Sequence, residues 1–196
     1  MASLKNKRIL FIGPVFFDYT KLIIDKLKEK GAFVHFINEN RLCFIENILR
    51  RISLKICKMI TNKLLLQKIN ESPTKIDIVF LLHGDLLSKA FMDKLKKKYH
   101  DSLFIMYQWD SVNNNKNIPF LSKYFKNIFS FDRLDSIKYN FNYLPNFYVN
   151  KKSKYKNEEP VFDLFFIGKA HTDRIEFINK VKKNLPKNIR TKFVIY

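Results

Sequence analysis

Short apolar runs alternate along the chain with longer amphipathic stretches. Most of the apolar runs stop abruptly at Gly or at a polar residue, as buried strands do before a turn. We expect strands at residues 8–12, 32–37, 77–82, 103–108, 127–131, 161–167 and 191–196, with a short extended piece at 143–145.

The stretches between these runs repeat apolar residues every three or four positions, which predicts amphipathic helices. The expected helices cover residues 19–30, 41–70, 87–99, 118–125, 134–139 and 171–184. Gly31 and Pro73 follow two of them, as helix-terminating residues often do. Because strand and helix alternate throughout, the sequence predicts an α/β fold with a Rossmann-like, mainly parallel sheet flanked by helices.

Residues 150–160 interrupt this pattern, since they are polar and charged and show no apolar periodicity. Such a segment is typical of a linker between domains. We therefore expect a first domain at residues 1–149 and a second domain that begins at residue 161. A single β-α-β unit at residues 161–196 cannot bury both faces of its sheet, so we interpret the second domain as truncated.

Basic residues outnumber acidic residues by 37 to 18, which gives a net charge of +19. This imbalance favours phosphate-bearing partners or an anionic membrane surface. A second explanation is AT-rich codon usage, because the chain is rich in Lys, Asn and Ile and contains only 4 Gly. The charge by itself therefore does not select a partner.

The helix expected at residues 41–70 carries Arg50, Arg51, Lys55 and Lys58 opposite its apolar stripe. A basic amphipathic helix can lie on an anionic membrane surface. A helix that packs on the sheet and leaves a charged face in water also explains this pattern.

Cys43 and Cys57 are the two cysteines, and their spacing suits no metal site. So few cysteines favour a reducing compartment. We expect no signal peptide before the first strand, and no apolar run approaches the roughly 20 residues of a membrane-spanning helix. We expect a cytoplasmic protein, either soluble or peripheral on the inner face of the cytoplasmic membrane. Motifs for a metal, a P-loop or a serine nucleophile are missing, so we expect no metal and no bound cofactor.

Residues that can take part in binding or catalysis follow four of the expected strands. They are Gly13, His83-Gly84-Asp85, Trp109-Asp110 and Asp132. The carboxyl ends of parallel strands share one edge of a sheet, and ligands bind outside that edge. This convergence indicates a site more strongly than any one of these residues does.

His83 can act as a general base or bind a hydroxyl or phosphate, although a loop histidine can also simply bond to backbone. Gly84 would let the backbone turn sharply beside a ligand. Asp85 is expected to cap the helix that follows, because Asp is a favoured N-cap residue.

Asp110 can accept hydrogen bonds from sugar hydroxyls, act as a base, or stabilise a turn. Trp109 can stack on a sugar or a base, or pack in the core. Asp132 resembles Asp110, but it can also pair with its neighbour Arg133. We take His83 and Asp110 as catalytic candidates, and Gly13, Gly84, Trp109 and Asp132 as substrate-binding candidates.

Gly168, Lys169 and Arg174 lie where the strand at 161–167 passes into the next helix. Backbone N–H groups at a helix N-terminus favour anions, and the two basic residues would add charge. This arrangement suits the diphosphate of a nucleotide-sugar. An ordinary strand–helix turn with solvated basic groups also explains it.

Several sequence phrases occur in a fixed order between residues 106 and 168. They are Met106-Tyr107-Gln108-Trp109-Asp110-Ser111, Ile128-Phe129-Ser130-Phe131-Asp132, Tyr143-Leu144-Pro145 and Asp163-Leu164-Phe165-Phe166-Ile167-Gly168. In these phrases the chain resembles bacterial glycosyltransferase-like proteins of lipopolysaccharide and capsular polysaccharide gene clusters, which have the GT-B architecture.

The resemblance implies two Rossmann-like domains with the active site in the cleft between them. It implies that His83, Trp109 and Asp110 line the side of a glycan or glycolipid acceptor. Gly168, Lys169 and Arg174 would then begin the nucleotide-sugar donor side. The implied reaction transfers a sugar to a surface polysaccharide or lipopolysaccharide. On this resemblance we expect most of the donor domain to be absent from this chain, which leaves open whether the chain acts alone.

Two other classes of function remain in view. A non-catalytic α/β binding module of receiver or flavodoxin-like type would use the basic surface for anionic partners. A receiver needs paired acidic residues after its first strand, where this chain has Gly13-Pro14-Val15-Phe16. Nucleic-acid binding through net charge is the third possibility, and we do not expect a nucleic acid to be the partner.

Overall fold

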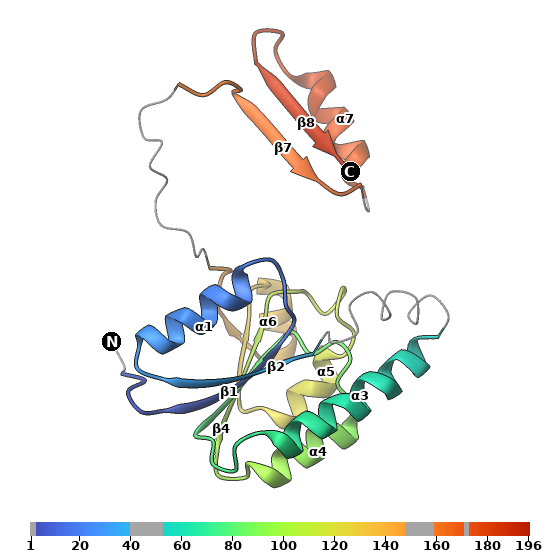
Figure 1. Cartoon of the computed structure of the whole chain (residues 1–196). Helices are drawn as coiled ribbons and strands as arrows, with labels where there is room; N and C mark the ends of the chain where they lie inside the picture. The colour runs from blue at the N-terminus through green and yellow to red at the C-terminus, as the bar shows by residue number, and fades with distance from the viewer. Residues whose placement is uncertain (1–2, 40–52, 148–158, 171–172) are drawn as a thin grey trace. The chain divides into compact units, whose positions relative to one another are not determined.

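The computed structural model describes residues 3–39, 53–147, 159–170 and 173–196. The chain divides into two compact units, residues 1–149 and residues 150–196 (Figure 1). The division falls at the first residue of the expected linker, and residues 150–158 of that linker lie outside the described part.

The first unit is built on a six-stranded sheet in which every strand pair is parallel. Its strands are β1 (Arg8–Gly13), β2 (Phe33–Asn38), β3 (Ile78–Leu82), β4 (Leu103–Gln108), β5 (Asn127–Ser130) and β6 (Asn142–Tyr143). They lie side by side in the order β2-β1-β3-β4-β5-β6. This is the doubly wound order of flavodoxin-type sheets, extended by β6, and its direction reverses between β1 and β3.

Helices cover both faces of this sheet (Figure 1). They are α1 (Tyr19–Glu29), α3 (Leu54–Glu71), α4 (Lys89–Lys98), α5 (Ile118–Leu121) with the 3-10 turn η1 (Ser122–Tyr124), and α6 (Arg133–Tyr139). On one face, Ile23 and Ile24 of α1 pack against Phe11 and its neighbours. On the other face, α3, α4 and α5 bury their apolar stripes, with Leu65 and Phe91 fully buried.

The predicted α/β class with a mainly parallel, Rossmann-like sheet is confirmed. The central strands β1 and β3 are nearly continuous apolar runs because both of their faces are covered. An ion pair also ties their amino ends together. Arg8 donates through Nη2 to Oδ1 of Asp77 at 2.7 Å, and its backbone N–H donates to Oδ2 of the same carboxylate.

The second unit contains β7 (Leu164–Gly168), α7 (Arg174–Asn184) and β8 (Thr191–Ile195), with β7 and β8 paired in parallel. Asp163 and Arg190 join the amino ends of its strands with the same bonding pattern as Asp77 and Arg8. Phe165 and Ile167 of β7 are 53% and 60% exposed. One face of this small sheet is therefore bare in the described residues.

Several element boundaries differ from the sequence-based expectations. α4 begins at Lys89 rather than at residue 87, and the Ser88 hydroxyl accepts a hydrogen bond from the backbone N–H of Phe91. Ser88 is thus the N-cap of α4, and the expectation that Asp85 caps this helix is wrong. α3 accounts for the later part of the helix expected at 41–70. Residues 41–52, with Cys43, Arg50 and Arg51, lie outside the described part.

None of the helices in the described ranges is long and apolar enough to cross a membrane.

Candidate functional site

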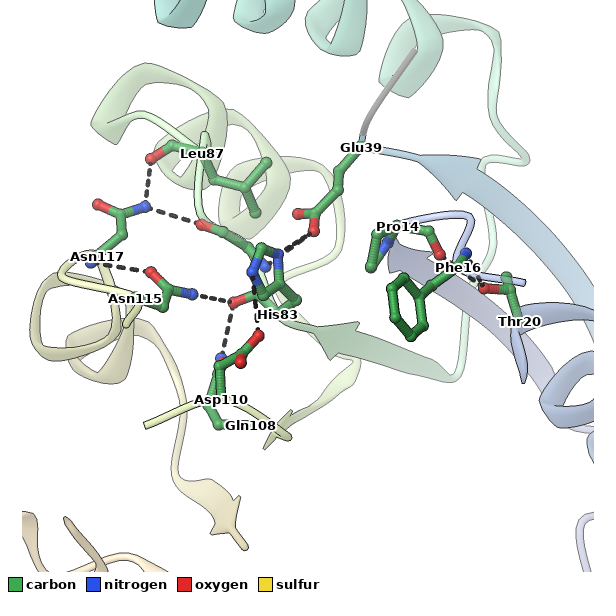
Figure 2. A network of polar contacts seen from close by, with 11 residues as sticks. Pro14, Phe16, Thr20, Glu39, His83, Leu87, Gln108, Asp110, Asn115 and Asn117 are labelled. Carbon is green, nitrogen blue, oxygen red and sulfur yellow. Dashed lines mark hydrogen bonds and ion pairs between the residues drawn. The ribbon is translucent and has the colours of Figure 1, made fainter. Parts of the chain in front are cut away.

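His83 is the first residue after β3, and its imidazole is held by a buried carboxyl group. Nδ1 of His83 lies 2.6 Å from Oε1 of Glu39, which follows β2 directly. The Glu39 side chain is only 1% exposed, whereas that of His83 is 18% exposed. The hydrogen between Nδ1 and Oε1 fixes the ring, so Nε2 is the nitrogen left for a ligand (Figure 2).

The backbone that carries His83 adopts a conformation that few side chains tolerate. His83 has φ +80° and Gly84 has φ +81°. At Gly84 a β-carbon would approach Cδ1 of Leu121 to 2.7 Å, so both the conformation and the space favour glycine. A non-glycine residue at positive φ stores strain, and such strain often accompanies functional sites.

Amide side chains from the next strand and loop hold this turn in place (Figure 2). Gln108 and Asn115 both donate to the carbonyl of His83, at 2.8 and 3.1 Å. Asn117 donates to the carbonyls of Gly84 and Leu87, at 2.9 and 3.0 Å. These bonds satisfy the carbonyls of His83 and Leu87, and they give the Gly84 carbonyl a second donor beside the backbone N–H of Leu87.

A cavity of about 480 Å³ opens beside His83 at the carboxyl edge of the sheet. Its lining consists of Pro14, Phe16, Tyr19, His83, Trp109, Asp110, Asn146 and Phe147. The turn after β1 brings Phe16 to this cavity, because the Thr20 hydroxyl donates to the carbonyl of Pro14 at 2.7 Å. The ring of Phe16 lies 5.8 Å from that of Trp109. Volume and aromatic lining both suit a small organic ligand.

Asp110 faces the same imidazole from the cavity side. Its Oδ2 lies 3.6 Å from Nε2 of His83, and its side chain is 38% exposed. His83 is therefore placed between a buried carboxyl group and a partly solvated one.

Both members of the buried pair have shifted pKa values. Burial raises the pKa of Glu39, against the opposing hydrogen bond and charge of His83. Its Oε2 is buried without a hydrogen-bond partner among the described residues. Burial by itself lowers the pKa of His83, but the hydrogen bond and charge of Glu39, with Asp110 and Asp85, raise it above 6.5 overall.

This arrangement is suited to general acid–base chemistry. A carboxyl group fixes the orientation of the imidazole on one side, and the free nitrogen on the other side can accept a proton from a ligand in the cavity. Because the hydrogen bond and charge of Glu39 raise the pKa of His83, its imidazole holds a proton more readily than an ordinary histidine does.

Three predicted site residues, His83, Trp109 and Asp110, meet at the cavity, and Gly84 supports them through its N–H bond to Oε1 of Glu39. Gly13 and Asp132 do not line it. A β-carbon at Gly13 would come within 3.2 Å of Leu82, so this glycine serves close strand packing.

Asp132 is the N-cap of α6, where its Oδ1 accepts hydrogen bonds from the N–H groups of Leu134 and Asp135. Its carboxyl group therefore contributes to the stability of that helix.

The predicted donor-side residues lie in the second unit. Gly168 ends β7, and the Arg174 guanidinium at the start of α7 donates to the carbonyl of Lys169 at 2.9 Å. The same guanidinium lies 5.7 Å from the ring of Phe166.

The most important residue that the sequence analysis missed is Glu39. Two signals were present: it stands at the carboxyl end of the second expected strand, and it is an acidic residue in a basic chain. Phe16, Tyr19, Asn146 and Phe147 were also missed, because aromatic and amide residues in loops carry no periodic signal.

The described residues contain no group of three or more His, Cys, Asp and Glu side chains that could hold a metal ion. Comparisons of the chain with protein-family models, curated proteins and solved structures give no match. The fold nevertheless defines the class, a doubly wound α/β protein with a candidate acid–base site at the carboxyl edge of its sheet.

Proposed function

We propose that the protein is a glycosyltransferase of GT-B type, which transfers a sugar from a nucleotide-sugar to a hydroxyl of a surface polysaccharide or lipopolysaccharide acceptor. The acceptor hydroxyl loses its proton to Nε2 of His83 while its oxygen bonds to the anomeric carbon of the donor. The bond from that carbon to the diphosphate breaks, and the nucleoside diphosphate leaves with the electron pair. In this scheme Glu39 is a positioning residue, because it acts through His83.

One observation carries the proposal: a buried carboxyl group orients an imidazole whose free nitrogen lines an aromatic cavity at the carboxyl edge of the sheet. An oriented base suits a reaction that must activate a hydroxyl. The resemblance in the ordered phrases between residues 106 and 168 supports a nucleotide-sugar as the class of donor. Gly168, Lys169 and Arg174 are the proposed donor-phosphate residues, through backbone N–H groups and positive charge.

The excess of basic residues supports an anionic partner, either the diphosphate of the donor or a membrane that carries the acceptor. Within the part of α3 whose side chains are described, Lys55 is exposed and available to a membrane surface.

The test measures release of UDP or GDP from a panel of uridine- and guanosine-diphosphate sugars in the presence of acceptor oligosaccharides. We expect His83→Asn to lower turnover by roughly 10²- to 10⁴-fold, since a general base is lost. Asn is chosen because it tolerates positive φ. The matched control is His100→Asn, since the His100 side chain is 73% exposed and precedes β4, whereas Trp109 and Asp110 follow the other end of that strand.

The alternative function is a non-catalytic binding module with a basic surface, and the flavodoxin-type strand order favours it. Under that alternative, no sugar nucleotide is turned over, and anionic ligands bind with an affinity that falls with salt and is unchanged in His83→Asn.

A further inference from the structure

The imidazole of His83 and the carboxyl group of Asp110 face each other at the cavity, and both can accept hydrogen bonds. Nε2 of His83 and Oδ2 of Asp110 are 3.6 Å apart, which is too far for a hydrogen bond, and both residues line the cavity. In the neutral imidazole, with its hydrogen on Nδ1 facing Glu39, Nε2 has a lone pair and no hydrogen. The lone pair and the carboxyl group can therefore each accept a hydrogen bond from a ligand in the cavity.

Two neighbouring hydroxyls on one sugar ring supply donors at this spacing. Staggered hydroxyls on adjacent ring carbons hold their oxygens about 3 Å apart. One hydroxyl can donate to Nε2 and the other to Oδ2, each over an ordinary length of about 2.7 Å. The bond to the ionised carboxyl group is the stronger type, because it is charge-assisted.

An aromatic surface stands beside these two acceptors. Trp109 precedes Asp110 directly, lines the same cavity and is half-buried against the Phe16 ring. A pyranose ring presents C–H groups on its faces and hydroxyls at its edge, so it can pack on an indole while its edge meets the acceptors.

Asn146 adds a further polar group to the lining of the cavity. The Tyr107 hydroxyl donates to Oδ1 of Asn146 at 2.8 Å, which orients this amide. Nδ2 of Asn146 donates no hydrogen bond to another side chain or carbonyl in the described part of the chain, so it can donate to a sugar oxygen.

We propose that Trp109, Asp110 and His83 form a subsite for one pyranose ring that presents two adjacent hydroxyls. The hydroxyl on His83 is the one that reacts, and Asp110 selects the sugar by accepting from its neighbour. Asp110 is thus a specificity-determining residue rather than a second base. The identity of the reacting hydroxyl rests on the proposed glycosyl transfer, whereas recognition of the diol does not.

The test measures binding of methyl glucoside, galactoside and mannoside, and of their monodeoxy derivatives, by saturation-transfer NMR on the whole chain. Asp110→Asn is expected to weaken binding of the recognised sugar about tenfold, as loss of one charge-assisted bond implies. For the derivative that lacks the selected hydroxyl, the same substitution should change affinity little. Asp101→Asn is the matched control, because the Asp101 side chain is 91% exposed.

Trp109→Phe should retain most of the binding and Trp109→Ala should lose it, since only Phe keeps an aromatic face. Equal losses for the parent and every monodeoxy sugar in Asp110→Asn would overturn the subsite, as would the absence of binding to every glycoside. If sugars bind with this selectivity but no sugar nucleotide is turned over, the subsite stands and the proposed transferase does not. If sugar-nucleotide turnover is observed, but Asp110→Asn lowers it equally for every monodeoxy acceptor, the proposed transferase stands and the subsite does not.

Discussion

The imidazole of His83 lies between two carboxyl groups, Glu39 buried on one side and Asp110 partly solvated on the other. The difference in burial separates their roles. Glu39 has no access to a ligand and can only orient the ring, whereas Asp110 can accept a hydrogen bond from one. At the scale of residues, the exposure of each carboxyl group to solvent therefore decides its role in the site.

The pKa of His83 provides a prediction that needs no substrate. Because Glu39 raises it, we expect the Cε1 proton of His83 to titrate above pH 6.5 in an NMR experiment. Glu39→Gln removes the charge and should move the titration to lower pH. If the protein is the proposed transferase and His83 is its base, the activity should rise with pH through the same raised pKa, and the acid limb of the pH profile should move to lower pH in Glu39→Gln.

His35 is an internal control for this titration. Its pKa is lowered, first by burial and then by the charges of Lys98 and Lys68, so it should titrate below pH 6.5 and be unaffected by Glu39→Gln. If His83 also titrates below pH 6.5, or if Glu39→Gln leaves the titration of His83 unchanged, Glu39 does not raise the pKa of His83.

At the scale of elements, the turn between β3 and α4 depends on side chains from the loop after β4. Asn117→Ala leaves the carbonyls of Gly84 and Leu87 without this donor. We expect this variant to lose about 1–3 kcal/mol of unfolding free energy, measured in urea. Amide hydrogen exchange should also speed up across residues 83–88.

Asn113→Ala is the matched control, because Asn113 is an exposed Asn in the same loop. It should change stability by no more than about 0.5 kcal/mol. Equal effects of the two substitutions would show that the loop amides do not hold the turn.

The Arg–Asp pairs at the amino ends of the strands are a second device at this scale. Each joins two parallel neighbours, Arg8 with Asp77 in the first unit and Arg190 with Asp163 in the second. Hydrogen bonds from the guanidinium lower the pKa of both aspartates, that of Asp163 to about 2. A lowered folded-state pKa means that this stabilisation is present at neutral pH and is lost only as pH falls towards that low value.

At the scale of the whole molecule, the two units should differ in stability. The first buries a core between two helical layers, whereas the second leaves Phe165 and Ile167 exposed. A unit with so little buried apolar surface is expected to be marginal. Trp109 lies in the first unit, so its fluorescence reports that unit alone, while far-UV circular dichroism reports both.

We therefore predict that the two signals do not coincide during urea unfolding. The dichroism should begin to change at lower urea concentration, and the Trp109 transition should follow as a separate step. Coincident curves would mean that the units unfold together and stabilise one another.

Local patterns in the sequence were sufficient to predict the class and most elements. β4 begins and ends where it was predicted, and β1 and α1 differ by one residue at their carboxyl ends. These elements follow apolar periodicity, which depends on neighbours a few positions apart. The start of α4 was less accurate, because Ser88 and Asp85 are both good caps and the choice depends on the path of the turn.

The sequence by itself also determined that His83, Trp109 and Asp110 would share one edge of a parallel sheet, since all three follow strands. Only the tertiary structure decided that Glu39 would orient His83, because the two residues are 44 positions apart and meet through strand order. It likewise decided that Asp132 would cap α6 instead of lining the cavity. Periodicity determines which residues enter strands and helices, but the pairing of distant strand ends arises only when the whole sheet is assembled and packed.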